Sequence, residues 1–488
     1  MTTTGPTTIS ARAAAADVGR PRRRHLPLAA ETGGELAAQS APFRASWPLS
    51  RRFIKTALWC TLTMGASFGA INLLTIHLAL GPVPPAHNWV HASFQLIGFV
   101  LLFVMGVAYQ VVPRSCRVPL ARVDLARASF RLTVGGLLLR AYGQFGPLLP
   151  ATAPSLLLGG LAILGGVVAF VAVLAATWRS VPHPRPRVGC PEIAAGTLWW
   201  MVAAALLVLE GVRAVRGGDA DLGARYNESF YLAALLGGAL SWVQGMVRRM
   251  EPTALAFRPP RARWLAAAFA ASQLGAAAAT VGAALPADSA AHHLRDAGLV
   301  VAALALGAFV IGARVFERSA PRPFSSHLAP LAVRRAVRFA FASAVLFAAL
   351  ALACGVADLT GHLLPTAAWD GARHALALGC ITTMILALGS HLVPRFAGAP
   401  LRRAGARDAG LILIAVGLVG REAEVLAPLL GSPRLLWISG SSGLVAATGV
   451  ALAASAILGA TRTTPGSPAR ERPEPALGDH EQRRPAGG

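Results

Sequence analysis

Residues 371–395 read GARHALALGCITTMILALGSHLVPR, an apolar stretch that ends in a proline and an arginine. Proline also ends two other apolar stretches, at positions 113 and 252, so that the three prolines are 139 and 142 residues apart. Nine residues after each proline stands an arginine, at Arg122, Arg261 and Arg403. A repeat of about 140 residues is too long for a solenoid unit, but it matches about four membrane-spanning helices with their connections. The repeat therefore predicts three groups of four helices.

The composition indicates a membrane protein. Hydrophobic residues make up 55% of the chain and charged residues 14%, and the mean hydropathy is +0.55. Soluble proteins of this size do not carry so much apolar sequence. Apolar stretches long enough to span occur at 53–80, 89–112, 129–149, 154–177, 192–215, 227–250, 262–285, 294–316, 336–363, 371–393, 408–430 and 435–460. We expect an all-α polytopic membrane protein with twelve transmembrane helices in three pseudo-repeated four-helix arcs.

The net charge of +23 is distributed in a way that argues against a nucleic-acid partner. Basic residues collect in alternate connections, such as those with Arg114 and Arg117 or with Arg402 and Arg403. The positive-inside rule assigns these connections to the cytoplasmic side. With an even number of helices, both termini are then cytoplasmic. This pattern predicts a multi-pass protein of the bacterial cytoplasmic (inner) membrane, with lipids as its immediate partners.

Three parts of the chain differ in composition. Residues 1–52 and 462–488 are rich in Ala, Pro, Gly and Arg with few bulky apolar residues, and we expect both to be disordered cytoplasmic tails. Residues 53–461 form the predicted twelve-helix domain. The five cysteines are scattered without CxxC or CxxCH spacing, which indicates neither a disulfide framework nor covalent haem attachment.

Two histidines occupy equivalent depths in the repeat. His91 lies 22 residues before the first repeat proline and His374 lies 20 residues before the third. Neutral imidazoles at one depth on facing helices are what axial ligation of a haem iron requires. Each histidine could instead be interfacial and face lipid headgroups. Ionisable residues within a membrane nevertheless mark a ligand or transport site by default.

Two arginines repeat in the same way. Arg140 and Arg421 each lie 27 residues after a repeat proline, and the helix directions place them toward the same leaflet as the two histidines. Haem propionates in a low-dielectric site need such cationic partners. The alternative is that both arginines extend to the headgroups.

These residues suggest a family. Twelve helices with histidines on the second and tenth resemble subunit I of haem-copper oxidases and nitric oxide reductases. Residues 91–114, HASFQLIGFVLLFVMGVAYQVVPR, are similar to the pattern HAHxxxxGF of NnrS-family proteins, with Ser93 in place of the second histidine. Residues 374–398 look like the corresponding tenth helix of that family. The resemblance implies a b-type haem, copper as a second possible cofactor, and a role in nitric oxide or nitrosative-stress response.

The chain also departs from the oxidases. Ala372 stands where the oxidases carry a high-spin haem ligand, and residues 226–249 of the sixth helix contain no histidine. His292 and His293 resemble paired copper ligands in position, and adjacent histidines bind a metal with help from a third ligand. Two loop histidines are also commonly just solvated. His87, four residues before His91, could share its helical face or cap the helix entrance.

The leading interpretation is a haem-binding membrane protein related to NnrS, with His91 and His374 as axial ligands and nitric oxide or an electron donor as its partner. Whether it is an enzyme stays open, because no turnover reaction follows from these residues. Two alternatives remain: an oxidase-like respiratory subunit with a non-standard metal site, and a twelve-helix secondary transporter. Glu210 and Arg213, one helical turn apart, are expected to pair with each other.

Overall fold

The computed structural model describes residues 45–145, 149–182, 188–217, 224–250, 254–286, 289–317, 328–362 and 364–461. All of them belong to one compact unit, Phe43–Gly488. The predicted tails therefore lie outside the described residues, apart from positions 45–52. Those positions are largely helical, because the first helix begins at Trp47 with Pro48 in its first turn, where proline is well tolerated.

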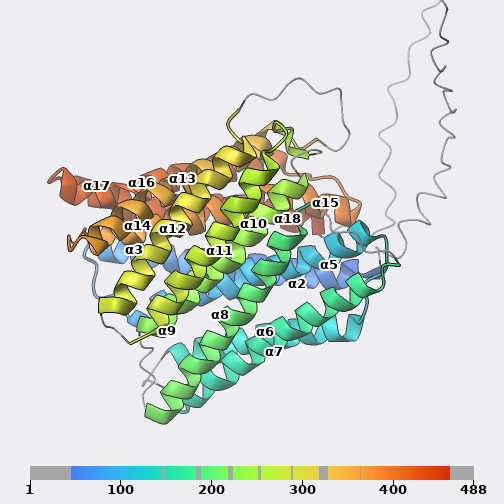
Figure 1. Ribbon diagram of the computed structural model, residues 1–488, viewed down its shortest axis with the longest axis horizontal. Coiled ribbons are helices and arrows are strands. Elements are labelled where there is room, and N and C mark those ends of the chain that lie inside the picture. The colour runs from blue at the N-terminus through green and yellow to red at the C-terminus, as the bar shows by residue number, and fades with distance from the viewer. Residues whose placement is uncertain are drawn as a thin grey trace, which may run out of the picture. The chain divides into compact units, whose positions relative to one another are not determined.

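Helices occupy all twelve expected stretches (Figure 1). In chain order they are α2 Trp47–Cys60, η1 Thr61–Gly65 and α3 Ala66–His77; α4 Pro85–Ser93, η2 Phe94–Leu101 and α5 Leu102–Cys116; α6 Val123–Gln144; α7 Thr152–Arg179; α8 Cys190–Gly217; α9 Ala224–Leu232, η4 Ala233–Ala239 and α10 Leu240–Met250; α11 Ala262–Ala284; α12 Ser289–Ala313; α13 Leu331–Leu359; α14 Thr366–His374, η6 Ala375–Thr382 and α15 Thr383–Ala397; α16 Ala404–Arg421 and α17 Ala423–Leu429; and α18 Arg434–Thr461.

Ten of these helices are long and apolar enough to cross a membrane. The other two expected spans are α6 and α16, which are 22 and 18 residues long and carry several charged side chains. No strand occurs among the described residues. The predicted all-helical polytopic membrane fold is confirmed.

The repeat read from the sequence has a structural counterpart. Arg122, Arg261 and Arg403 are the N-cap residues of α6, α11 and α16, so each stands where the chain enters the next helix. Pro113 and Pro394 do not end their helices, because α5 and α15 each continue for three more residues. The helices end instead at backbone of left-handed conformation, at positions 117 and 398. Residues 251–253, with the middle proline, lie outside the described residues.

The arcs do not follow the chain in consecutive blocks from its first helix. One arc is α6, α7, α8 and the α9–η4–α10 helix, and the next is α11, α12, α13 and the α14–η6–α15 helix. The third combines both ends of the domain, since α16 packs on α18, α18 packs on α3, and the first helix packs on the second. Figure 1 shows α6 and α7 side by side at one edge of the bundle and α16 near the opposite edge.

Three helices meet at the centre, and each contains a π-helical segment. These segments are η2, η4 and η6, and they belong to the second, sixth and tenth helices of the repeat. Segment η4 contacts both η2 and η6, and α5 contacts α15. A π-helical turn inserts an extra residue and often marks a functional site. All three segments are almost entirely buried.

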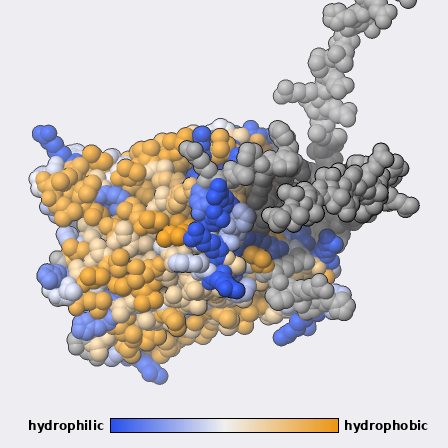
Figure 2. All heavy atoms as spheres, turned by 45° about the horizontal axis from the view of Figure 1, so that its top comes forward, coloured by the Kyte–Doolittle hydropathy of each residue, from blue (hydrophilic) through white to orange (hydrophobic). Residues whose placement is uncertain are grey.

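The outside of the bundle is suited to lipid. Figure 2 shows a broad band of hydrophobic residues, with hydrophilic residues gathered mainly beside it. Exposed apolar side chains come from many helices, among them Leu138, Leu158, Leu274, Ile311 and Val419. A soluble protein rarely exposes apolar patches of this extent. The band therefore marks the surface that faces the membrane.

Candidate functional site

A cavity of about 410 Å³ lies among the two helices that carry the predicted ligands and their neighbours. Its wall is formed by residues of α3, α4, η2, α14, η6, α16 and α18, together with Tyr231 of α9 and Leu235 of η4. His91 and His374 both line it. The structure therefore brings together the two histidines that the repeat placed at equal depth, in a space of the size that holds a cofactor.

The imidazole of His91 is held by the first helix. Its Nδ1–H donates a hydrogen bond of 2.7 Å to the carbonyl oxygen of Gly65, where the π-helix η1 ends and the backbone leaves helical geometry with ψ of −102°. Gly69 makes room for the ring, because a Cβ there would lie 2.5 Å from His91 Cε1. A carbonyl can only accept, so the proton is on Nδ1 and the lone pair of Nε2 is left for a metal.

His374 is held in the same way from its own helix. Its Nδ1–H donates to the carbonyl oxygen of Asp370, one turn earlier, at 2.9 Å. Among the described residues, no hydrogen bond to Nε2 of either histidine is recorded. Metal-bound histidines commonly use one ring nitrogen for such a bond and the other for the metal. Both rings at the cavity are thus set in the tautomer that ligation by Nε2 requires.

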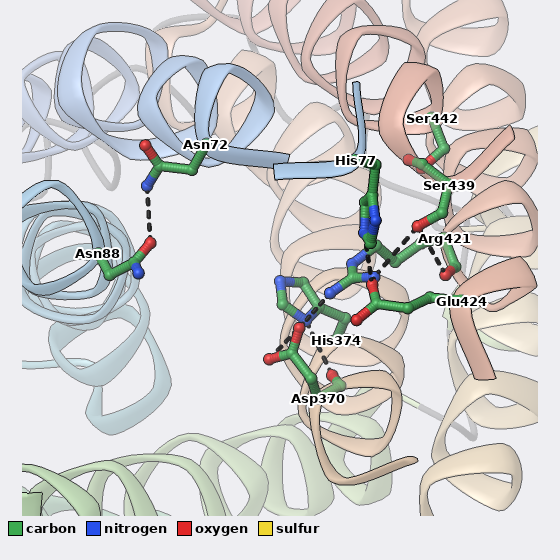
Figure 3. Close-up of polar contacts among 9 residues, drawn as sticks. All are labelled: Asn72, His77, Asn88, Asp370, His374, Arg421, Glu424, Ser439 and Ser442. Atoms are coloured by element: carbon green, nitrogen blue, oxygen red, sulfur yellow. Dashed lines mark hydrogen bonds and ion pairs between the residues drawn. The ribbon is translucent and has the colours of Figure 1, made fainter. Parts of the chain in front are cut away.

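A partly buried ionic cluster forms one end of the site (Figure 3). The guanidinium of Arg421 forms ion pairs with Asp370 and Glu424 and donates to Ser439 Oγ at 3.2 Å. Glu424 also binds His77, with Nε2 and Oε2 2.9 Å apart. The cluster ties α3, α14, α16 and α18 together beside His374, and Arg421 and Asp370 both line the cavity.

Two further polar features border the same space. Asn72 and Asn88 are joined by a hydrogen bond of 2.8 Å between α3 and α4 (Figure 3). Arg373 lines the cavity and has no recorded ion pair or hydrogen bond with the rest of the described chain. Of the two arginines that line the cavity, Arg421 is in direct contact with carboxylates, whereas Arg373 acts on Asp370 only from a distance.

The other predicted arginine lies elsewhere. Arg140 does not line the cavity. Its guanidinium is buried 2.8 Å from the carboxylate of Glu210 and donates to Ser93 Oγ at 3.3 Å and Asn227 Oδ1 at 3.4 Å. Glu210 thus pairs with Arg140 and not, as expected, with Arg213, which lies over the ring of Tyr226. Spacing along one helix could not show this, because the pair joins α6 to α8.

Comparison with known proteins bears on the fold. No protein-family model matches the sequence, and no curated protein matches it. Among solved structures, the chain is similar to a heme-copper terminal oxidase dimer determined by cryo-electron microscopy, with a TM-score of 0.66. The match covers 85% of this chain and 84% of that chain. The chain has a heme-copper oxidase-like fold. Sequence identity is 12%, so the likeness extends to the fold alone, and it gives the NnrS resemblance no support.

The three histidines that were considered as copper ligands, His87, His292 and His293, do not form a metal site with other described residues. His292 and His293 are both exposed in the first turns of α12. His87 packs its ring against Phe68, with centroids 5.1 Å apart, and does not line the cavity. Within the described ranges there is no group of three or more His, Cys, Asp or Glu that could hold a metal ion. These histidines therefore have no third ligand in the described part of the chain.

Several residues of the site were missed from the sequence, although signals for them existed. Asp370 precedes His374 by four residues and Glu424 follows Arg421 by three, the spacings that place side chains on one helical face. Tyr231 lies 21 residues before the middle proline, between the values of 22 and 20 for the two histidines. The repeat itself therefore pointed to Tyr231, which lines this cavity from the sixth helix beside Leu235.

Proposed function

We propose that this protein is a membrane haem protein, in which His91 and His374 are the axial ligands of a b-type haem. One observation carries the proposal: both imidazoles line one cavity, and both donate Nδ1–H to a backbone carbonyl. Two rings with matching tautomers on different helices are what bis-histidine ligation needs. The oxidase-like fold supports the proposal, since such folds can hold haem.

The other residues that line the cavity are suited to a haem. A haem is a flat apolar ring with two carboxylates on one edge, and the wall offers apolar side chains such as Leu378, Ile381 and Val450. Arg373 is available for a carboxylate, whereas Arg421 is shared with Asp370 and Glu424. A buried carboxylate without a cation nearby would be costly. The positions of these arginines therefore limit where the carboxylate edge of the haem can lie.

The ligand set limits the chemistry. A haem with imidazole on both faces exchanges single electrons and offers no open position for a further ligand. The residues of this chain would hold the rings in place through Gly65 and Asp370 and exclude water through the apolar wall. We therefore propose one-electron transfer as the activity, with an electron donor as partner and without turnover of a substrate at this site.

A reduced-minus-oxidised absorption spectrum of the purified protein tests the proposal. The wild type should show the bands of a six-coordinate b-type haem, and His91→Ala and His374→Ala should each lose most of the bound haem. His87→Ala is the matched control, because His87 lies one turn from His91 but outside the cavity. Free imidazole should restore part of the haem signal in the two alanine variants. A wild type without haem would refute the assignment.

The resemblance of the two histidine helices to NnrS proteins is the basis for proposing a process. We propose that the protein serves the response to nitric oxide or nitrosative stress in the bacterial cytoplasmic membrane. Electron transfer through the haem would be its contribution, since both axial positions are taken. The basic connections support an orientation with both termini in the cytoplasm.

This role predicts a difference in growth. Cells that lack the gene should grow more slowly than wild-type cells when a nitric oxide donor is present, and equally well without it. Complementation with the wild type or His87→Ala should restore growth, and His374→Ala should not. Equal growth of all five strains under the donor would contradict the nitric oxide role and leave the haem assignment untouched.

A further inference from the structure

A second group of polar side chains is buried beside the cavity, and the proposed function does not use it. It consists of Ser93 of α4, Arg140 and Gln144 of α6, Glu210 of α8 and Asn227 of α9. All five are at most 4% exposed. Charged groups at such depth in a membrane domain are costly and by default have a function.

The two charges of this group touch without sharing a hydrogen bond. Arg140 Nη1 and Glu210 Oε2 are 2.8 Å apart, but the guanidinium is not aligned to donate. Neither carboxylate oxygen of Glu210, nor Oε1 of Gln144, accepts a hydrogen bond from the described residues. Buried acceptors in this position are normally satisfied by water or by a proton. Either oxygen of Glu210 therefore has no hydrogen-bond donor within the described part of the chain and can accept from water or take up a proton.

Tyr231 stands between this group and the cavity. Its side chain lines the cavity, and it lies one helical turn after Asn227, which accepts from Arg140. Its phenol lies within electrostatic range of Arg140 and Glu210 and also of Arg373, which lines the cavity. A change of charge in the cavity is thus felt across one side chain, in surroundings of low dielectric where such effects are strong.

Few other groups compete with Glu210. Of the elements packed on α8, α7 contributes only Arg179 at its far end, and η4 contributes no titratable side chain. Arg248 and Arg249 of α10 lie at the opposite end of the bundle, where Arg248 pairs with Glu192. On α9, Tyr226 lies under Arg213, and Glu228 forms an ion pair of 3.5 Å with Arg295 of α12. Arg140 and Tyr231 are therefore the ionisable groups that face Glu210 from neighbouring helices.

We propose that Glu210 is the proton-accepting site of this domain and takes up one proton when one electron enters the haem cavity. The inference rests on the proposed function. An external one-electron donor supplies the electron and water supplies the proton, so that the carboxylate becomes a neutral carboxylic acid and Arg140 keeps its charge. The proton offsets the added negative charge, since a nearby negative charge favours the protonated form of a carboxyl.

Redox-difference infrared spectroscopy tests the step directly. On reduction, the wild type should gain the C=O band of a protonated carboxyl, which shifts in D₂O, and Glu210→Gln should lack this band. The midpoint potential of the wild type should fall by up to about 59 mV for each tenfold decrease in proton concentration. In the variant it should be independent of pH over the same range.

Two further variants guard against misfolding and misassignment. Arg140→Gln combined with Glu210→Gln leaves no unpaired charge, so it should fold, keep the haem and lack the band. Glu192→Gln combined with Arg248→Gln removes the other buried pair and should keep the band. A band that survives in the Glu210 variants, or a wild type with haem but neither band nor pH dependence, overturns the proposal. A wild type without haem refutes the proposed function instead.

Discussion

Arg421 and Arg373 are both arginines of the cavity wall, yet their surroundings differ. Arg421 is 5% exposed and holds two carboxylates and a serine, so it joins four helices. Arg373 is exposed and has no recorded partner in the described chain. The first is therefore a structural cation, and the second is available to a ligand.

This contrast predicts that the same substitution, arginine to glutamine, has different effects at the two positions. Arg421→Gln should lower the free energy of unfolding by about 1–3 kcal/mol, because Asp370 and Glu424 lose their cation but keep partial contact with water. Arg373→Gln should leave stability nearly unchanged and weaken haem retention. Thermal unfolding and haem content of the two purified variants are the measurements. A destabilised Arg373→Gln would show that this side chain has a structural partner.

At the scale of elements, the close approach of the first two helices positions His91. The π-helix η1 ends at Gly65, whose carbonyl accepts from the imidazole, and Gly69 lies flat against the ring. A regular α-helix with larger side chains here would fill the space of the ring. The sequence of this segment thus positions an imidazole that belongs to a different helix.

Gly69→Ala should disturb the ligand without disturbing the fold. The added Cβ would lie 2.5 Å from His91 Cε1, so the ring must move and the bond to Gly65 must lengthen. We expect lower haem content and an altered absorption spectrum. Gly307→Ala is the control, since nothing lies within 4 Å of a Cβ at that helical position. Identical spectra for both variants would mean that Gly69 does not position His91.

The elements could be predicted much better than the contacts between them. A span needs about 20 apolar residues, and every helix begins within six residues of its expected position. The number of residues to a repeated proline was enough to predict that His91 and His374 lie at one depth, and both line the same cavity. The pair between Arg140 and Glu210 was not predictable, because it depends on α6 and α8 sharing an arc. The π-helical segments have no periodic signal of their own in apolar sequence.

For the whole molecule, the distribution of basic residues leads to a test of orientation. Impermeant thiol reagents label only residues on the outer face of intact cells. In a cysteine-free background, Pro82→Cys should be labelled, because the connection after the first helix carries no charge, and Ser180→Cys should be protected until the cells are lysed. Both positions are exposed. The reverse pattern would place the termini outside.

The packing of α18 on α3 has a consequence for how the protein matures. The cavity is lined by Ala70 and Leu73 near the start of the domain and by Ser442 and Gly443 near its end. Because a ribosome releases the first helix long before α18, the wall of the cavity stays incomplete until α18 has been made. Loading of the proposed haem would therefore be a late step of biogenesis, and a nascent chain arrested before residue 434 would present the two histidines to lipid and water.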